Sequence, residues 1–314
     1  MNKIAFVFPG QGAQAVGMGK DFYDNFIEAR NVYEKADEVL NRSISKICFE
    51  GPEEDLKQTT NTQPAIVSTS IAMYEVLSKK TGIKPSYLAG HSLGEYCAMY
   101  AGGVLNLEDT IYLISKRAEA MSKVKGGSMA AVLNLDEEKL KDCLKEASSK
   151  GYVDVANYNS PSQIVITGES EAVKFASELM TQSGARRVVP LAVSGAFHSK
   201  MMEEASREFS KSLADVSLND ANIPVITNVD AKSTTNSSDF VEKMPRQIYS
   251  SVQWTQSVQN MINEGVDTFV EIGPGKVLAG LIKKISPEVK VFNVFDIESL
   301  NSTVEALNSE FSAV

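Results

Sequence analysis

The pentapeptide GHSLG at residues 90–94 constrains this chain more than any other stretch. A short apolar run at 87–89 precedes it and predicts a buried strand, and the small-residue stretch that follows predicts a helix. Between a strand and a helix, G-x-S-x-G is typical of a nucleophile elbow, a sharp turn with serine at its apex. The flanking glycines leave room for that turn. Ser92 then stands at a helix N-terminus, which favours developing negative charge. A coincidental match in an ordinary loop is the alternative.

Composition excludes several classes of protein. The chain has 314 residues, with 31 basic and 40 acidic side chains and a formal charge of −9, which argues against a general nucleic-acid binder. We find no signal peptide and no apolar run near the ~20 residues of a membrane span. Three cysteines (Cys48, Cys97 and Cys143) lack metal-ligand spacing, and the chain has only two histidines. We therefore expect a cytoplasmic protein with reduced thiols and without a metal.

Two patterns of secondary structure divide the chain. Residues 1–126 and 198–314 alternate strand, loop and helix, with buried strands expected at 3–8, 223–231 and 266–272. This alternation predicts an α/β fold with a mostly parallel sheet covered by helices. Residues 127–197 follow the order β-α-β-β-α-β, which predicts a small ferredoxin-like domain inserted into the larger one.

The glycine-rich loop at residues 10–15, GQGAQA, has two interpretations. It matches the G-x-G-x-x-G/A fingerprint of dinucleotide-binding proteins. That fold needs a second strand ending in an acidic residue about 20 positions later, where this chain predicts a helix from about residue 21 to 40. The other interpretation is a turn that directs backbone amides and the Gln11 side chain into a site. In elbow enzymes one oxyanion donor follows the nucleophile and another comes from an early loop, so Leu93 N–H and Gln11 fit this role.

A serine nucleophile needs a base, and the chain offers His91 and His198. The side chain of His91 should diverge from its neighbour Ser92, which favours packing or capping. His198 is the candidate base, because its loop returns to the large domain and can reach the elbow. The third group that orients the imidazole is not visible. An acid, a backbone carbonyl or an amide side chain could fill that role. This chemistry predicts acyl transfer through a serine ester.

Arg117 shares one face of a predicted helix with two apolar residues, Ile114 and Met121. Arginine is almost never fully buried without a partner. The pattern is equally consistent with a snorkelling arginine, a structural ion pair and an anion clamp inside the site. Gln63 begins another predicted helix and faces a pocket, caps the helix or faces solvent.

Seven motifs occur in the order found in malonyl-CoA:acyl carrier protein transacylases, and the chain resembles this family over nearly its whole length. They are FPGQGAQ, NTQPA, GHSLGE, the arginine of SKRAEAM, GAFHS, VQWTQSV and EIGPGKVLAGL. The resemblance implies an α/β-hydrolase-like large subdomain with a ferredoxin-like insertion. It also implies ping-pong transfer of a malonyl group from malonyl-CoA to the phosphopantetheine thiol of acyl carrier protein, in fatty acid or polyketide synthesis.

The same resemblance implies a role for each site residue. Ser92 carries the malonyl group, His198 is the base, and Gln11 and Leu93 N–H form the oxyanion hole. Arg117 pairs with the malonyl carboxylate, and the segment containing Gln253 orients the histidine. The remaining residues line the acyl pocket or meet coenzyme A: Gln63, Met121 and Phe197 for the pocket, and Arg187, with Arg186, for the coenzyme phosphates. An exposed strand end is the alternative for the two arginines.

The family also implies no cofactor beyond the coenzyme A thioester, and we expect a monomer without nucleic-acid or membrane partners. Two other functions share part of the pattern. A serine hydrolase such as a thioesterase would use the same elbow, base and oxyanion hole. A non-catalytic carrier-binding module would keep the fold, although intact Ser92 and His198 argue against it.

Overall fold

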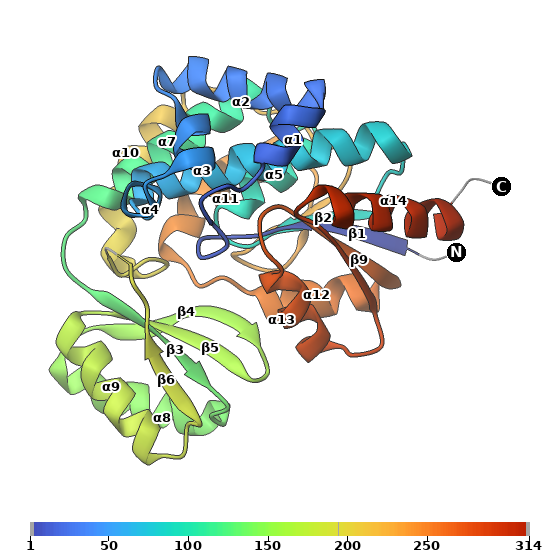
Figure 1. The fold of residues 1–314 in the computed structure, drawn as a ribbon. Coiled ribbons are helices and arrows are strands. Elements are labelled where there is room, and N and C mark those ends of the chain that lie inside the picture. Colours follow the sequence, from blue (N-terminus) through green and yellow to red (C-terminus); the bar gives the residue numbers. More distant parts are fainter. Residues whose placement is uncertain (1–2, 194, 312–314) are drawn as a thin grey trace.

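The large sheet lies at the centre of the computed structural model, which describes residues 3–193 and 195–311 (Figure 1). Its strand order is β10-β9-β1-β2-β7-β8, and all neighbours are parallel except the antiparallel pair β7 and β8. This confirms the predicted, mostly parallel sheet. The strands are β1 (Lys3–Phe8), β2 (Tyr87–Gly90), β7 (Val225–Ile226), β8 (Ser233–Thr234), β9 (Val266–Ile272) and β10 (Lys290–Val294).

The central strand β1 is apolar and buried from Ile4 to Phe8, because helices cover both faces of the sheet. Phe6 and Phe8 belong to a core formed with helices that include α5, α7 and α14. Ala5 and Val7 point to the opposite face and pack in a second core with α12 and α13. The helices of this part are α1 (Lys20–Asn25), α2 (Ile27–Leu40), α3 (Ile44–Glu50), α4 (Glu53–Leu56), α5 (Thr59–Thr81), α6 (Gly94–Ala101), α7 (Leu107–Lys123), α10 (Glu203–Leu213), α11 (Ser237–Tyr249), α12 (Trp254–Asn263), α13 (Val277–Ile285) and α14 (Ile297–Phe311).

Two predicted elements differ from the structure. The helix expected at 21–40 is interrupted at Phe26, whose extended backbone ends α1 and begins α2. The strand expected at 223–231 is only two residues long, Val225–Ile226. A tight turn follows it, in which the Ala231 amide donates to the Thr227 carbonyl. This turn brings Asn228 back over the end of β2.

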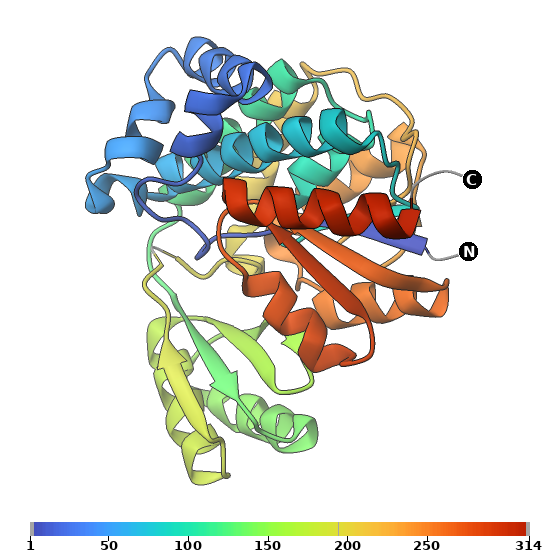
Figure 2. The same cartoon turned by 45° about the vertical axis from the view of Figure 1, so that its right-hand side comes forward.

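The second sheet lies inside the predicted segment 127–197 and has the predicted β-α-β-β-α-β order. Its strands are antiparallel in the order β4-β5-β3-β6, and two helices pack on one face over a separate apolar core. Figures 1 and 2 show this lobe below the large sheet. Its elements are β3 (Ser128–Leu133), α8 (Glu137–Ala147), β4 (Val153–Ser160), β5 (Gln163–Gly168), α9 (Ser170–Gln182) and β6 (Arg187–Pro190).

Candidate active site

The turn between β2 and α6 has the geometry of an elbow. Ser92 has a φ of 53°, a left-handed conformation that is uncommon for residues other than glycine. A Cβ atom on Gly90 would lie 1.9 Å from the carbonyl carbon of Gly94, and one on Gly94 would lie 2.3 Å from the Phe8 carbonyl oxygen. The two glycines therefore permit the close approach of β1, β2 and α6 that the sequence motif predicts.

Ser92 and His198 form a close pair. Their Oγ and Nε2 atoms are 2.7 Å apart, and the imidazole Nδ1 faces the backbone carbonyl oxygens of Gln247 at 3.0 Å and Ser250 at 3.2 Å. Two acceptors at Nδ1 hold the ring proton there, so Nε2 accepts from the serine hydroxyl. Burial and the nearby Arg117 charge lower the pKa of His198 to about 3. The imidazole is therefore a neutral base at neutral pH.

The predicted role of Gln253 in orienting the histidine is wrong. Gln253 precedes α12, and its backbone amide donates to the Asn228 carbonyl at 2.9 Å. The hydrogen-bond partners of the imidazole Nδ1 come from the end of α11 instead, at Gln247 and Ser250. The last carbonyls of a helix have no partner inside the helix, so they are available to the imidazole.

Arg117 is buried but has no ionic partner. Only 1% of it is exposed, and its guanidinium donates to Gln63 Oε1 at 2.7 Å, Gln247 Oε1 at 3.0 Å and Ser92 Oγ at 3.1 Å. All three acceptors are uncharged. Within residues 3–193 and 195–311, no carboxylate lies within 4.0 Å of this guanidinium, and its Nε–H has no acceptor. These contacts exclude the snorkelling and ion-pair interpretations.

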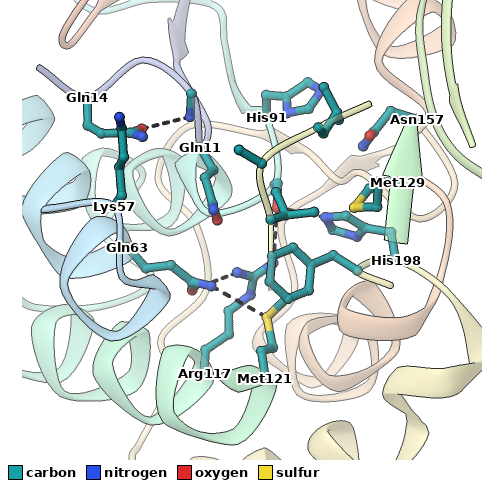
Figure 3. Close-up of a pocket in the computed structure, with 16 residues that line it drawn as sticks. Gln11, Gln14, Lys57, Gln63, His91, Arg117, Met121, Met129, Asn157 and His198 are labelled. Atoms are coloured by element: carbon teal, nitrogen blue, oxygen red, sulfur yellow. Dashed lines mark hydrogen bonds between the residues drawn. The ribbon is translucent and has the colours of Figure 1, made fainter. Parts of the chain in front are cut away.

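A cavity of about 290 Å³ opens over Ser92, His198 and Arg117. Figure 3 shows the side chains of Gln11, Arg117 and His198 directed into the same space. Other predicted residues that line it are Gln63, Met121 and Phe197. Gln63 is not a helix cap, because its amide bridges Arg117 and the Met121 sulfur, the latter at 3.5 Å.

The predicted oxyanion donors lie on opposite sides of Ser92 in sequence. Gln11 lines the cavity, whereas the Leu93 side chain is buried, so only its backbone amide can serve. In the part of the chain that the structure describes, neither the backbone amide of Leu93 nor that of Gln11 donates a hydrogen bond to another residue. Both amides thus remain available for a developing oxyanion.

Two other predicted residues, His91 and Arg187, have no hydrogen bond to Ser92 within the described residues, although His91 also lines the cavity. His91 bonds Asn159 at 2.7 Å and packs edge-on against Trp254, in agreement with its predicted packing role. Arg187 is exposed at the beginning of β6, four residues before Leu191, where this segment first lines the cavity. Its contact with coenzyme A stays a prediction.

Sequence reasoning missed Gln247 and Asn228. The Gln247 side chain bonds both Arg117 and the Ser92 carbonyl, and the Asn228 side chain accepts from the Ser92 amide at 2.8 Å. Asn228 follows the buried strand β7, and a polar residue at the carboxyl end of a parallel strand was an available signal. Gln247 lies in no recognisable motif.

No helix in ranges 3–193 and 195–311 is long and apolar enough to cross a membrane. The same residues hold no cluster of three or more histidine, cysteine, aspartate or glutamate side chains suited to a metal ion.

Comparison with known proteins places these features in a family. The acyl transferase domain model matches residues 5–297. The malonyl CoA-acyl carrier protein transacylase of Bacillus subtilis is 44% identical and covers 99% of both chains, and that of Staphylococcus aureus strain MRSA252 is 41% identical over 96% of this chain and 98% of its own.

Solved structures that are similar to this chain belong to the same kind of enzyme. An acyl carrier protein S-malonyltransferase from Vibrio cholerae has a TM-score of 0.93 at 38% identity, over 96% of this chain and 100% of its own. A malonyl-transacylase solved with its type II polyketide acyl carrier protein has a TM-score of 0.94 at 36% identity, over 97% and 100%. The chain is therefore an acyltransferase and belongs to the acyl transferase family, in which these similar proteins are malonyl CoA-acyl carrier protein transacylases.

Proposed function

We propose that this enzyme transfers a malonyl group from malonyl-CoA to the phosphopantetheine thiol of acyl carrier protein, through a malonyl ester on Ser92, for fatty acid synthesis. The names of its relatives support the substrates. The observation that carries the proposal is the buried Arg117, whose guanidinium lies 3.1 Å from the Ser92 hydroxyl and has no carboxylate partner among the described residues. A malonyl group has one carboxylate to offer this guanidinium, whereas an acetyl group has none.

In the first half-reaction, Ser92 Oγ attacks the thioester carbonyl while His198 Nε2 takes the hydroxyl proton. The Leu93 amide and the Gln11 loop stabilise the oxyanion. Collapse of the tetrahedral intermediate breaks the carbon–sulfur bond, and the imidazolium returns its proton to the departing coenzyme A thiolate. The α11 carbonyls that face Nδ1 stabilise this imidazolium, so no buried acid is required.

In the second half-reaction, the carrier thiol gives its proton to His198 and attacks the malonyl ester. The serine oxygen leaves and is reprotonated. One nucleophile serves two thioesters, so free coenzyme A is released before the carrier binds. Phe197 bounds the acyl pocket and disfavours branched groups. We further propose that the enzyme acts as a monomer in the cytoplasm, with no cofactor beyond its coenzyme A thioester.

Mass spectrometry after mixing with malonyl-CoA or acetyl-CoA tests this function. We expect a malonyl adduct on Ser92 that survives in water, discharges to added holo carrier protein and is absent from Ser92→Ala. Rapid loss of the adduct to water would support a serine hydrolase. Absence of any adduct with either thioester would support a non-catalytic carrier-binding module. A malonyl adduct that persists in Ser92→Ala would assign the nucleophile elsewhere.

A further inference from the structure

The elbow is held from the side by Asn228, a residue far away in sequence. The Asn228 Oδ1 atom accepts from the Ser92 amide at 2.8 Å, and its Nδ2 donates to the Gly90 carbonyl at 2.6 Å. The Asn228 side chain thus connects Gly90, before the turn, with Ser92 at its apex. These contacts also fix its orientation, because the flipped amide would place a donor against a donor and an acceptor against an acceptor. A serine with a φ of 53° keeps this conformation only where surrounding contacts determine it.

Asn228 is in turn anchored by Glu95, the second residue of α6. The Asn228 backbone amide donates to Glu95 Oε2 at 2.6 Å. Both residues are buried, with exposed fractions of 1% for Asn228 and 2% for Glu95. The carboxylate lies on the helix that begins at the elbow, so the chain Glu95–Asn228–Ser92 closes a ring of contacts around the turn.

Within residues 3–193 and 195–311, the Glu95 carboxylate forms no ion pair. The nearest cations that act on it, Arg117 and Lys243, do so at longer range, and Lys243 pairs instead with Asp230 at 3.1 Å. Burial raises the pKa of Glu95 to about 7, against the opposing effect of its hydrogen bond from Asn228. A carboxylate buried at this cost without a counter-ion requires a local reason.

We propose that Glu95 is a positioning residue, which acts through Asn228 to hold the Ser92 backbone in its reactive conformation. The inference rests on the proposed role of Ser92 as nucleophile. Glu95 itself touches neither the acyl group nor the reacting atoms. Glu95 contributes to the acylation rate of Ser92. The choice of acyl group depends instead on Arg117 in the proposed mechanism.

Two variants separate the hydrogen bond from the packing. Glu95→Gln keeps an oxygen that can accept from the Asn228 amide, whereas Glu95→Met keeps the volume and loses the acceptor. In single-turnover acylation by malonyl-CoA, we expect Glu95→Met to be slower on the order of 10- to 100-fold, the value of one hydrogen bond to a charged group, and Glu95→Gln to stay close to wild type. The preference for malonyl over acetyl should be unchanged in both. Equal rates in Glu95→Met and wild type, or a changed preference, would overturn the proposal.

A double-mutant cycle tests the route through Asn228. If Glu95 acts by way of Asn228, Glu95→Met should slow acylation little further in an Asn228→Ala background. Additive effects would overturn the proposal. As a matched control, Glu271 is another buried glutamate that accepts backbone amides, at 3.0 Å from Leu278, but it has no bond to the elbow. Glu271→Met should lower the melting temperature without slowing acylation of the folded fraction.

Labelling of Ser92 by a small sulfonyl fluoride distinguishes failure of this proposal from failure of the proposed function. The reagent reports on an activated serine whatever its acyl group. If wild type did not accept malonyl-CoA, the proposed function would fail, yet slower labelling of Glu95→Met than of Glu95→Gln would still support the positioning role. Equal labelling of the two variants would overturn it.

Discussion

If the enzyme selects malonyl groups as proposed, replacing Arg117 by alanine should leave it with little preference between malonyl and acetyl groups. The guanidinium is buried and its three acceptors are uncharged, so a bound malonyl carboxylate would be its first ionic partner. Two unit charges about 4 Å apart attract by roughly 4 kcal/mol at an effective dielectric constant of about 20. Each 1.36 kcal/mol corresponds to about tenfold in rate, and truncation of buried charged pairs costs about 2–5 kcal/mol. We therefore expect malonyl transfer to fall on the order of 10²–10³-fold.

The same substitution should leave acetyl transfer nearly intact. The acetyl group has no carboxylate, so it loses no ionic contact. Arg117 also lowers the pKa of His198, and its removal makes the imidazole a stronger base. The guanidinium also donates to Ser92 Oγ at 3.1 Å. This hydrogen bond uses a lone pair of the oxygen atom that attacks the thioester, so its loss does not weaken the nucleophile. Acetyl transfer should thus fall little or rise.

Single-turnover acylation by malonyl-CoA and acetyl-CoA, measured by quenching and mass spectrometry, gives the ratio directly. Arg42→Ala is a suitable control, because the Arg42 guanidinium also donates to uncharged acceptors, at Thr60 and Asn61, but does not line the cavity. Melting temperatures should be recorded for both variants. If the two acylation rates fell in parallel with a lowered melting temperature, Arg117 would be structural, and the malonyl preference would have to come from elsewhere in the pocket.

Three further predictions concern the base, the elbow and the helix that joins them. Because the pKa of His198 is lowered to about 3, the imidazole stays neutral at pH values below the ordinary histidine pKa of about 6.5. The Glu95→Gln variant lacks the buried carboxyl with a pKa of about 7, so its kcat/KM between about pH 5 and about pH 8 should show no histidine limb, and such a limb in this variant would contradict the environment of His198. Gly94→Ala should lower both the melting temperature and the acylation rate, because its Cβ would lie 2.3 Å from a backbone oxygen, whereas Gly280→Ala, with no atom within 4 Å, should be stabilising by about 0.5–1 kcal/mol. Gln247→Leu removes the side-chain bonds to Arg117, the Ser92 carbonyl and Asn228 but keeps the carbonyl that faces the imidazole. Loss of the bond to the Ser92 carbonyl alone, at about 1.5 kcal/mol, should slow acylation roughly 10-fold, and an unchanged rate would show that this bond does not support the elbow.

The residues that the sequence predicted correctly are those whose environment is local. The elbow follows from two glycines four positions apart, and the inward direction of Arg117 follows from helical spacing within α7. The small sheet was predictable in the same way, because its strands and helices succeed one another without a break in pattern. The motif order added the roles of these residues, and nothing in their local geometry opposes them.

The residues that were missed or misassigned depend on contacts across the fold. Asn228 reaches the elbow only because β7 is short and the chain turns immediately after it, which the apolar run at 223–231 does not reveal. Gln253 was assigned to the histidine because it lies in a motif, but the motif begins α12, whereas the imidazole meets the end of α11. The packing of helices decides which residues about 50 positions apart in the sequence come into contact. The periodicity of a single segment does not contain this information.

The end of α11 explains why this site needs no acid beside its histidine. The carbonyls of Gln247 and Ser250 face Nδ1, and they belong to the negative end of a helix, which stabilises a protonated imidazole. Gln247 also bonds the Arg117 guanidinium through its side chain. The Arg117 charge already acts on this imidazole, since it lowers the pKa of His198, so a carboxylate beside the ring would attract the guanidinium and compete with a malonyl carboxylate for it. Under the proposed mechanism, neutral carbonyls orient the base and leave the guanidinium without an ionic partner among the described residues, so that it can pair with a malonyl carboxylate.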